Sequence, residues 1–434
     1  MSALRLKGAR VVDPYRGSDT EANVGVDADG RFASPDLPLA GPVEELDCRG
    51  LWLVPRVVDL HVHFREPGQE YKEDITSGSQ AAAAGGVSVV GLMPNTVPVA
   101  DSEAAMAQVL SRVAEVGLVE AWGIGAVTQG SLGQEPADWE GMRRAGARAL
   151  SDDGHPVASS RLMSLALAYS ARQGRPIPVI QHLEDPELSC GGVAHDGPVA
   201  ARLGLPGMPG AAESVLAWRD IGLVRAFGGR IHFAHCSVPD TLEALASARA
   251  AGLAATGEAA PHHLLLTDEE LASWHPGGMA KVNPPLRPGT MREALCQAVE
   301  RGVITVAASD HAPHGALEKA RPFAEAPFGI SGIETLLAVL LTVLHHGRQR
   351  TPLEVMRLVT AGPHAVVGEP YAGVVPGAAA DFALIDPQAR WQVDPPRFYS
   401  RGQNTPLAGH TLRGQVVATV RGGQFIFREG QVVR

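Results

Sequence analysis

Cysteine and lysine are both scarce in this sequence of 434 residues. The four cysteines lie far apart and form no Cys-x-x-Cys pair, which excludes a disulfide framework and a zinc site built on thiolates. Only four of the 37 basic residues are lysines, namely Lys7, Lys72, Lys281 and Lys319. The longest apolar run, Leu336 to Leu344, is too short to cross a bilayer, so the sequence predicts no membrane partner.

Positive charge and a leader segment are lacking as well. A formal net charge of -10 argues against nucleic acid as a partner. No charged segment followed by an apolar one opens the sequence, so the expected location is the cytoplasm. With 45% hydrophobic and 19% charged residues, the composition is that of an ordinary globular protein. The length suffices for one large domain and a smaller one.

The two ends of the chain are rich in short β-like runs, whereas the middle alternates between strand-like and helix-like segments. Residues 1 to 54 contain such runs at 4–12, 22–26, 44–47 and 51–54, and residues 371 to 434 contain them at 380–386, 415–420 and 424–427. We therefore expect both termini to build one small β-sandwich domain. The predicted division is 1–54 and 371–434 for that domain and 55–370 for the remainder.

The middle of the chain contains eight candidate strands, each followed by a helical segment. The strands are expected at 57–63, 87–93, 120–127, 147–151, 178–182, 230–235, 253–258 and 303–309. Eight such units predict a (β/α)8 barrel, the TIM barrel of metal-dependent hydrolases. A doubly wound open sheet is the alternative, but it usually carries a glycine-rich phosphate loop after its first strand, and this sequence has none there.

The first of these strands carries two histidines on one face. Because side chains alternate along a strand, Asp59, His61 and His63 point the same way. Two imidazoles side by side on a rigid strand can bind one divalent metal ion. A pair of this kind is by itself more often structural, so the other strand ends decide its meaning.

Polar or imidazole residues stand at the ends of seven of the eight strands, where barrel enzymes place their chemistry. Six of them are nitrogen or oxygen donors suited to Zn2+ or a similar ion: His61, His63, Asp153, His182, His235 and Asp310. Six donors exceed one tetrahedral site but suffice for two metals that share a bridging group. Two ions about 3.5–4 Å apart can hold a hydroxide and polarise a carbonyl, which favours hydrolysis of an amide-like bond.

Other residues near the strand ends suit the remaining steps of such a hydrolysis. Arg65 and Asn95 could hold an anionic substrate, because a guanidinium offers a fixed fork of donors to a carboxylate. Asp310 could carry a proton from the attacking hydroxide to the departing nitrogen.

Short motifs along essentially the whole chain occur in the order and spacing of one known family. They are His61–Gly68, Lys72–Asp74, Met93–Thr96, Ser151–Gly154, Pro261–Leu264, Val282–Arg287, Ser309–His314, Glu325–Gly329, Asn404–Pro406 and Gly409. The set resembles dihydroorotases of the class I type, in the amidohydrolase superfamily. This resemblance implies the barrel, the β-sandwich from both termini, and the reversible conversion of L-dihydroorotate to N-carbamoyl-L-aspartate, the third step of pyrimidine (UMP) synthesis.

The same resemblance assigns roles to the metal ligands. His61 and His63 would bind one zinc ion, His182 and His235 the second, and Asp153 would bridge them. Asp310 would be a ligand of the first zinc and the catalytic acid and base. One or two ions per subunit are compatible with this set, and two are favoured.

The resemblance also implies which residues bind the substrate. Arg65, Asn95 and His314 would bind its carboxylate, while Asn283 and the backbone of Phe328 and Gly329 would contact its ring. Residues 315–326 would form an active-site loop. A homodimer and an aspartate transcarbamoylase partner are both compatible with the family.

The shortage of lysine separates this sequence from hydantoinases and from other dihydroorotases, which bridge their metals with a carboxylated lysine at the end of strand four. Here Asp152 and Asp153 stand at that place, and register with the family favours Asp153. One departure is visible: Arg56 replaces the glycine that usually follows the proline opening strand one. A glycine there would serve close packing or an unusual dihedral angle.

Two alternatives to dihydroorotase stay open at this point. One is a different cyclic amidohydrolase, an allantoinase or a hydantoinase, against which the Arg65, Asn95 and His314 set and the missing lysine count. The other is a non-catalytic partner of a transcarbamoylase, against which the complete set of six donors counts.

Overall fold

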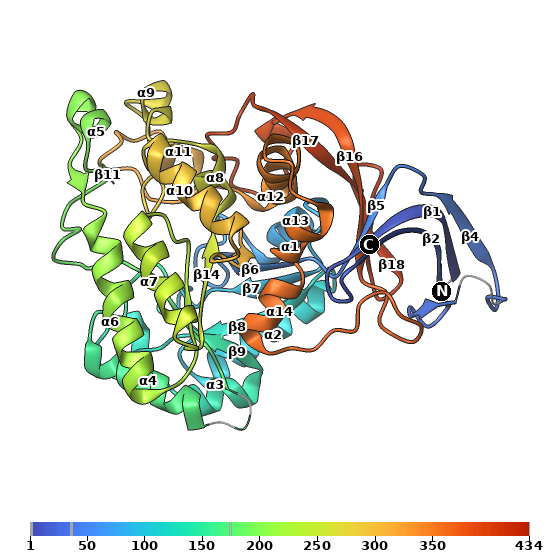
Figure 1. The fold of residues 1–434 in the computed structure, drawn as a ribbon, viewed down its shortest axis with the longest axis horizontal. Coiled ribbons are helices and arrows are strands. Elements are labelled where there is room, and N and C mark those ends of the chain that lie inside the picture. Colours follow the sequence, from blue (N-terminus) through green and yellow to red (C-terminus); the bar gives the residue numbers. More distant parts are fainter. Residues whose placement is uncertain (1–2, 35–37, 173, 175, 434) are drawn as a thin grey trace.

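The structure is a computed structural model that describes residues 3–34, 38–172, 174 and 176–433 (Figure 1). Within these residues, eight parallel strands form a barrel in the order in which they occur in the chain. They are β6 (Val58–Val62), β7 (Val89–Leu92), β8 (Glu120–Gly125), β9 (Ala147–Leu150), β10 (Val179–Gln181), β13 (Ile231–Phe233), β14 (Ala255–Ala259) and β15 (Val306–Ala307). A parallel bridge between Val62 and His311 brings the last strand back to the first. All eight predicted strands are confirmed.

Helices surround the barrel (Figure 1). The longer ones are α1 (Ile75–Ala84), α2 (Glu103–Val116), α3 (Trp139–Ala145), α4 (Ser160–Arg172), α6 (Ala211–Phe227), α7 (Pro239–Ala250), α10 (Gly289–Glu300) and α14 (Ala361–Val367). The remaining helical segments are η1 (Gln129–Ser131), α5 (Pro198–Leu203), α8 (Pro261–Leu265), α9 (Glu270–Trp274), α11 (Ala316–Lys319), η2 (Ile333–Thr335), α12 (Leu336–Leu340), η3 (Leu341–Gly347), α13 (Pro352–Arg357) and η4 (Pro395–Arg397). A small ladder of β11 (Ala194–His195) and β12 (Gly207–Met208) lies before α6. Among the described residues, no helix is long and apolar enough to span a membrane.

An apolar cluster fills the interior of the barrel. Its members come from most of the strands and include Val58, Leu60, Val89, Trp122, Ile124, Ile180 and Val306. Close approach of β6 and β7 depends on Gly91, because a Cβ at this position would lie 2.2 Å from the Leu60 carbonyl oxygen. This packing holds β6, the strand with the two histidines, rigidly in the barrel wall.

The two termini meet in one sheet, on the right of Figure 1, where both chain ends lie. Its nine strands, counted over the described residues, are β1 (Ala3–Asp13), β2 (Ser18–Val26), β3 (Phe32–Ala33), β4 (Val43–Asp47), β5 (Trp52–Pro55), β16 (Phe382–Gln392), β17 (Thr411–Arg421), β18 (Gln424–Arg428) and β19 (Gln431–Val432). Antiparallel pairing of β5 with β16 joins the N-terminal and C-terminal halves. The predicted fold class, a barrel with a small β domain from both termini, is confirmed. The predicted boundaries 54/55 and 370/371 stay predictions.

Arg56 lies where the terminal sheet passes into the barrel. Its backbone has φ +39°, a left-handed conformation that glycine adopts without strain. This is the unusual dihedral angle for which a glycine was expected at this position. The guanidinium compensates in part, because it forms ion pairs with Glu120 on β8 and Asp381 beside β16, and its side chain is only 13% exposed. Arg56 therefore ties the sheet to the barrel.

Candidate metal centre and substrate pocket

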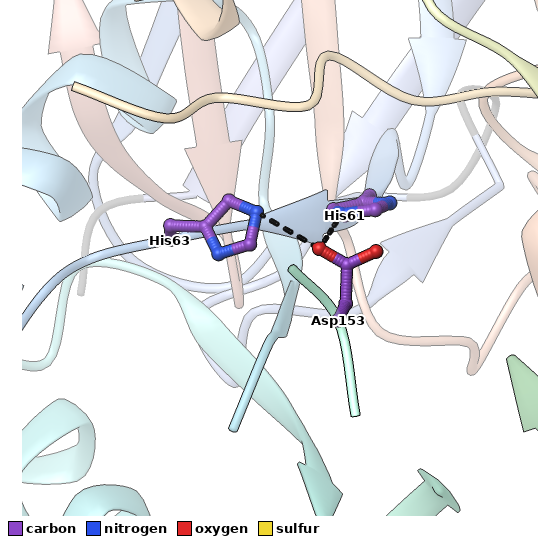
Figure 2. A group of neighbouring side chains, drawn as sticks. All are labelled: His61, His63 and Asp153. Atoms are coloured by element: carbon purple, nitrogen blue, oxygen red, sulfur yellow. Dashed lines mark ion pairs between the residues drawn. The ribbon is translucent and has the colours of Figure 1, made fainter. Parts of the chain in front are cut away.

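The carboxylate of Asp153 lies at the centre of four imidazoles. Its Oδ2 is 3.2 Å from His61 Nε2 and 3.5 Å from His63 Nε2, and Figure 2 shows both rings directed at this oxygen. On the other side, Oδ1 is 3.4 Å from His182 Nδ1 and 3.5 Å from His235 Nε2. Each oxygen thus faces its own pair of histidines, as a bridging carboxylate would.

The donor atoms fit a pair of metal ions that share Asp153. Ligands at about 2.0–2.1 Å from a tetrahedral zinc ion stand about 3.3–3.4 Å apart, close to the four distances above. His61 Nε2 and Asp153 Oδ1 are buried and accept or donate no hydrogen bond among the described atoms. Buried polar atoms without partners are costly, and each of these two atoms belongs to its own group of clustered donors, so each group suits a bound cation. The residues present therefore fit a metal centre.

Asp152 and Asp153 turn in opposite directions at the end of β9. The Asp152 carboxylate accepts hydrogen bonds from the backbone N–H of Val127 (2.8 Å), the backbone N–H of Thr128 (3.0 Å) and the Thr128 hydroxyl (2.6 Å). Both of its oxygens therefore accept hydrogen bonds from the loop after β8. Burial alone would raise the pKa of Asp153, but the charge of His61 and the nearby imidazoles of His182 and His235 outweigh it and hold that pKa well below the usual value.

Three of the histidines have an oxygen partner on the nitrogen that faces away from Asp153. His61 Nδ1 lies 2.7 Å from Glu258, His63 Nδ1 lies 2.8 Å from Asn95 Oδ1, and His182 Nε2 lies 2.9 Å from Glu184. Such partners fix the ring orientation and leave the inward nitrogen free to bind metal. Glu258 and Glu184 were missed by the sequence analysis. Glu258 ends the predicted seventh strand, and this position was the available signal for it.

Asp310, at the end of β15, faces the same group of side chains. Its Oδ1 is 3.4 Å from His63 Nε2 and 3.7 Å from His61 Nε2. Burial opposes ionisation, yet the nearby imidazoles of His63, His61 and His235 keep the pKa of Asp310 below its usual value. The backbone at Asp310 has φ +48°, which is strained for a residue other than glycine and is typical of functional sites.

The side chain of His311 anchors the segment that carries Asp310. Its Nε2 is 3.3 Å from the fully buried Glu73, and its Nδ1 accepts the N–H of Gly332. Glu73 also accepts hydrogen bonds from the Ser400 hydroxyl and the Arg401 N–H, which belong to the C-terminal part of the chain. These contacts hold the segment that carries Asp310 against the C-terminal part of the chain.

Arg65 carries a buried positive charge beside this cluster. The side chain donates to the Pro313 carbonyl (3.2 Å) and lies 3.4 Å from His314 Nε2, and none of the carboxylates in the described residues is within ion-pair distance of it. The residue is 8% exposed, and burial lowers the pKa of its guanidinium to about 10. A buried cation without an anion is costly. The arrangement suits an anionic ligand.

His314 lies next to Arg65 but is electrically neutral. Burial and the charge of Arg65 lower the pKa of His314 to about 2. Its Nε2 donates to the Phe328 carbonyl at 2.7 Å, which leaves Nδ1 without a hydrogen bond among the described atoms, 3.8 Å from a carboxylate oxygen of Glu318. The predicted grip of His314 on a carboxylate would therefore need a proton on Nδ1, and an incoming anion favours that proton.

Lys319 anchors the segment that contains Phe328 and Gly329. This lysine, 1% exposed, donates to the carbonyls of Pro327 (3.0 Å), Gly329 (2.8 Å) and Lys281 (3.1 Å). The Gly329 N–H donates to the Lys281 carbonyl. Of the four backbone groups of Phe328 and Gly329, the Phe328 N–H alone has no partner among the described residues. The predicted loop 315–326 contains α11 and the anchored Lys319.

Comparisons with known proteins agree with this fold and site. A family model described as dihydro-orotase-like matches residues 50–241, and one for the amidohydrolase family matches residues 224–427. A dihydroorotase of Anaeromyxobacter dehalogenans is 43% identical, with 99% of each chain covered. One from Pelotomaculum thermopropionicum is 43% identical, covering 99% of this chain and 100% of the relative.

Solved structures add a similarity of fold. An L-hydantoinase from Arthrobacter aurescens superposes with a TM-score of 0.87 at 23% identity, over 100% of this chain and 98% of that one. A dihydropyrimidinase from Brevibacillus agri gives 0.84 at 20% identity, over 99% and 96%.

The barrel, the histidines and aspartates at its strand ends and the amidohydrolase match together place this chain among the amidohydrolases, and the family and the two donor groups point to a bound metal. At 43% identity over nearly its whole length, the chain belongs to the dihydroorotase family.

Proposed function

We propose that this protein is a dihydroorotase that hydrolyses the cyclic amide of L-dihydroorotate to N-carbamoyl-L-aspartate and catalyses the reverse reaction in pyrimidine synthesis. The observation that carries the proposal is Arg65. Its buried charge lacks an anionic partner among the described residues and lies next to a candidate metal centre, so this site suits a ring with a carboxylate. Full-length relatives named dihydroorotase support the same substrate.

The carboxylate of the substrate would lie between Arg65 and Asn95. Because the Asn95 oxygen is directed at His63 Nδ1, its amide nitrogen is free to donate to an anion. His314 would add a donor once the anion has raised its pKa. The ring would lie toward Asn283 and the N–H of Phe328, and the peptide of Gly329 would support the wall of the pocket.

The catalytic proton would move through Asp310. Zinc is the metal best suited to four imidazole nitrogens and bridging carboxylate oxygens: His61 and His63 would hold one ion and His182 and His235 the other, with Asp153 shared and Asp310 beside the first. When bound, these ions lower the pKa of a water molecule and polarise the amide carbonyl. Asp310, kept ionised by its neighbours, accepts a proton from the attacking water and delivers it to the ring nitrogen that departs.

The second candidate is a hydantoinase or allantoinase. The likeness to solved hydantoinases at 20–23% identity concerns the fold alone. Where such relatives would need a carboxylated lysine at the end of strand four, this chain has Asp153 among the four imidazoles. A neutral hydantoin would also leave the charge of Arg65 without a partner.

Turnover by the purified protein alone tests the proposal. We expect hydrolysis of L-dihydroorotate without a transcarbamoylase and little hydrolysis of hydantoin or allantoin. Metal analysis of protein purified without chelators should give close to two zinc ions per chain. Absence of turnover with a full metal complement would contradict the proposal and would favour a non-catalytic partner.

Assembly and location complete the proposal. We infer a homodimer in the cytoplasm, with an aspartate transcarbamoylase as a compatible protein partner that turnover does not require. Sedimentation velocity of the purified protein, alone and mixed with the transcarbamoylase of the same organism, measures both associations. A monomer at micromolar concentration would contradict the dimer.

A further inference from the structure

Two asparagine side chains near the metal centre are oriented in opposite ways: one leaves its amide nitrogen free, and the other leaves its amide oxygen free. The Asn95 oxygen accepts from His63, so its amide nitrogen is available to donate. Asn283 is held the other way, because its Nδ2 lies 2.7 Å from the Glu184 carboxylate. A carboxylate oxygen accepts hydrogen bonds and does not donate them, so the amide nitrogen of Asn283 must face Glu184. The Asn283 oxygen then accepts no hydrogen bond within the described residues.

Glu184 holds a second donor with the same oxygen. Its Oε2 lies 2.9 Å from His182 Nε2, so this nitrogen carries the hydrogen. The other ring nitrogen, Nδ1, is therefore the bare one, and it lies 3.4 Å from Asp153 Oδ1. Asn283 Nδ2 is itself only 3.3 Å from His182 Nε2, so the two side chains are neighbours. With 19% of its side chain exposed, Glu184 is packed between them.

We propose that Glu184 is a positioning residue that sets the polarity of the pocket: it fixes the Asn283 oxygen toward the ligand, so that this side of the pocket selects a ring N–H, and it fixes the metal-binding tautomer of His182. The pocket then presents a donor to a carboxylate at Asn95 and an acceptor to a ring N–H at Asn283. The part concerning Asn283 rests on the proposed function, since it assumes that this residue faces the substrate.

The substitution Glu184→Gln isolates this role with little change in shape. A glutamine can present either an oxygen or an amide group, so Asn283 loses the constraint on its orientation. We expect KM for dihydroorotate to rise about tenfold, with a smaller fall in kcat, because an acceptor for the ring N–H is lost part of the time. Asn283→Ala should raise KM by at least as much.

A double-mutant comparison decides whether Glu184 acts through Asn283. In the Asn283→Ala background, Glu184→Gln should raise KM no further. The matched control is Asp185→Asn, which removes the neighbouring charge. Among the described residues, the Asp185 carboxylate accepts only the N–H groups of Glu187 and Leu188. This control should leave KM within twofold. Effects of Glu184→Gln and Asn283→Ala that multiply, or a KM unchanged in Glu184→Gln, would overturn the proposed action on Asn283.

Zinc affinity provides a readout that does not depend on the substrate. Apoprotein titrated with Zn2+ against a chromophoric chelator should show one class of site weakened about tenfold or more in Glu184→Gln, because the His182 tautomer is no longer fixed. Asp185→Asn should bind zinc as the wild type does. Unchanged zinc affinity in Glu184→Gln would overturn the action on His182. If the wild type binds zinc but does not hydrolyse dihydroorotate, the proposed function fails, and this titration still decides the role of Glu184.

Discussion

Replacing Arg65 by glutamine tests the claim that a buried cation recognises the substrate's carboxylate. A guanidinium and a carboxylate about 4 Å apart attract each other by about 4 kcal/mol at an effective dielectric constant near 20. Loss of one partner of a buried, hydrogen-bonded charge pair costs about 2–5 kcal/mol. Since about 1.4 kcal/mol corresponds to a tenfold change, KM for dihydroorotate should rise between about 30-fold and 4,000-fold. The effect should appear mainly in KM, because the carboxylate is bound throughout the reaction.

The assay compares dihydroorotate with 5,6-dihydrouracil, which has the same ring without the carboxylate. Activity on the neutral ring should be the same in the wild type and in Arg65→Gln, so the preference for dihydroorotate should collapse. Arg112→Gln is a matched control, because Arg112 is a half-exposed arginine paired with Glu66. Stability should not fall in Arg65→Gln, since the charge it removes has no carboxylate partner among the described residues. A KM within twofold of the wild type would refute the carboxylate clamp.

Four further outcomes are expected. Chelation should abolish hydrolysis and added Zn2+ should restore it; activity that survives complete metal removal would contradict the metal centre. Asp310→Asn should lower kcat by about 100-fold to 10,000-fold, the usual range for a lost acid and base, and robust turnover would exclude the proton transfer. Burial raises the pKa of Glu334 from 4.5 to about 8, although the N–H groups of Tyr399 and Ser400 oppose this shift. Between pH 4.5 and pH 8 the folded state therefore keeps a proton on Glu334 that the unfolded state has lost. The unfolding free energy then falls as pH rises through this range. Urea unfolding of Glu334→Gln should lack this decline, and parallel pH profiles of the two proteins would contradict it. Arg56→Gly should relieve about 1–2 kcal/mol of backbone strain but leave Asp381 buried and unpaired at a cost of about 3–5 kcal/mol, so the net effect should be destabilising by thermal unfolding. A gain in stability would show that the strain dominates.

The barrel and the positions of the candidate ligands could be predicted because both depend on short-range patterns. Side-chain alternation places His61 and His63 on one face, and the rule that barrel enzymes use their strand ends brings His182 and His235 near them. These rules need only the order of strands. The structure places all four histidines around Asp153, as expected for a shared site.

The hydrogen-bond partners of these residues could not be predicted because they come from distant parts of the chain. Asp152 is turned away by donors on Val127 and Thr128, more than twenty residues earlier, and adjacent carboxylates look alike in the sequence. Glu258 meets His61 across the barrel at a sequence separation of 197. Arg56 was the exception, since the departure from glycine already indicated an unusual dihedral angle, which the structure has.

The pairing of β5 with β16 has a consequence for synthesis on the ribosome. Trp52 on β5 pairs with Ile385 on β16. Strand β5 therefore lacks this neighbour until a segment more than three hundred residues later has been synthesised. At about 5–20 residues per second, this delay is roughly 15–65 s. During that time β5 presents an unpaired edge and three apolar side chains that the finished protein buries, Trp52, Leu53 and Val54. Such an edge invites aggregation, so the nascent chain depends on rapid barrel folding or on chaperones until its last strands emerge.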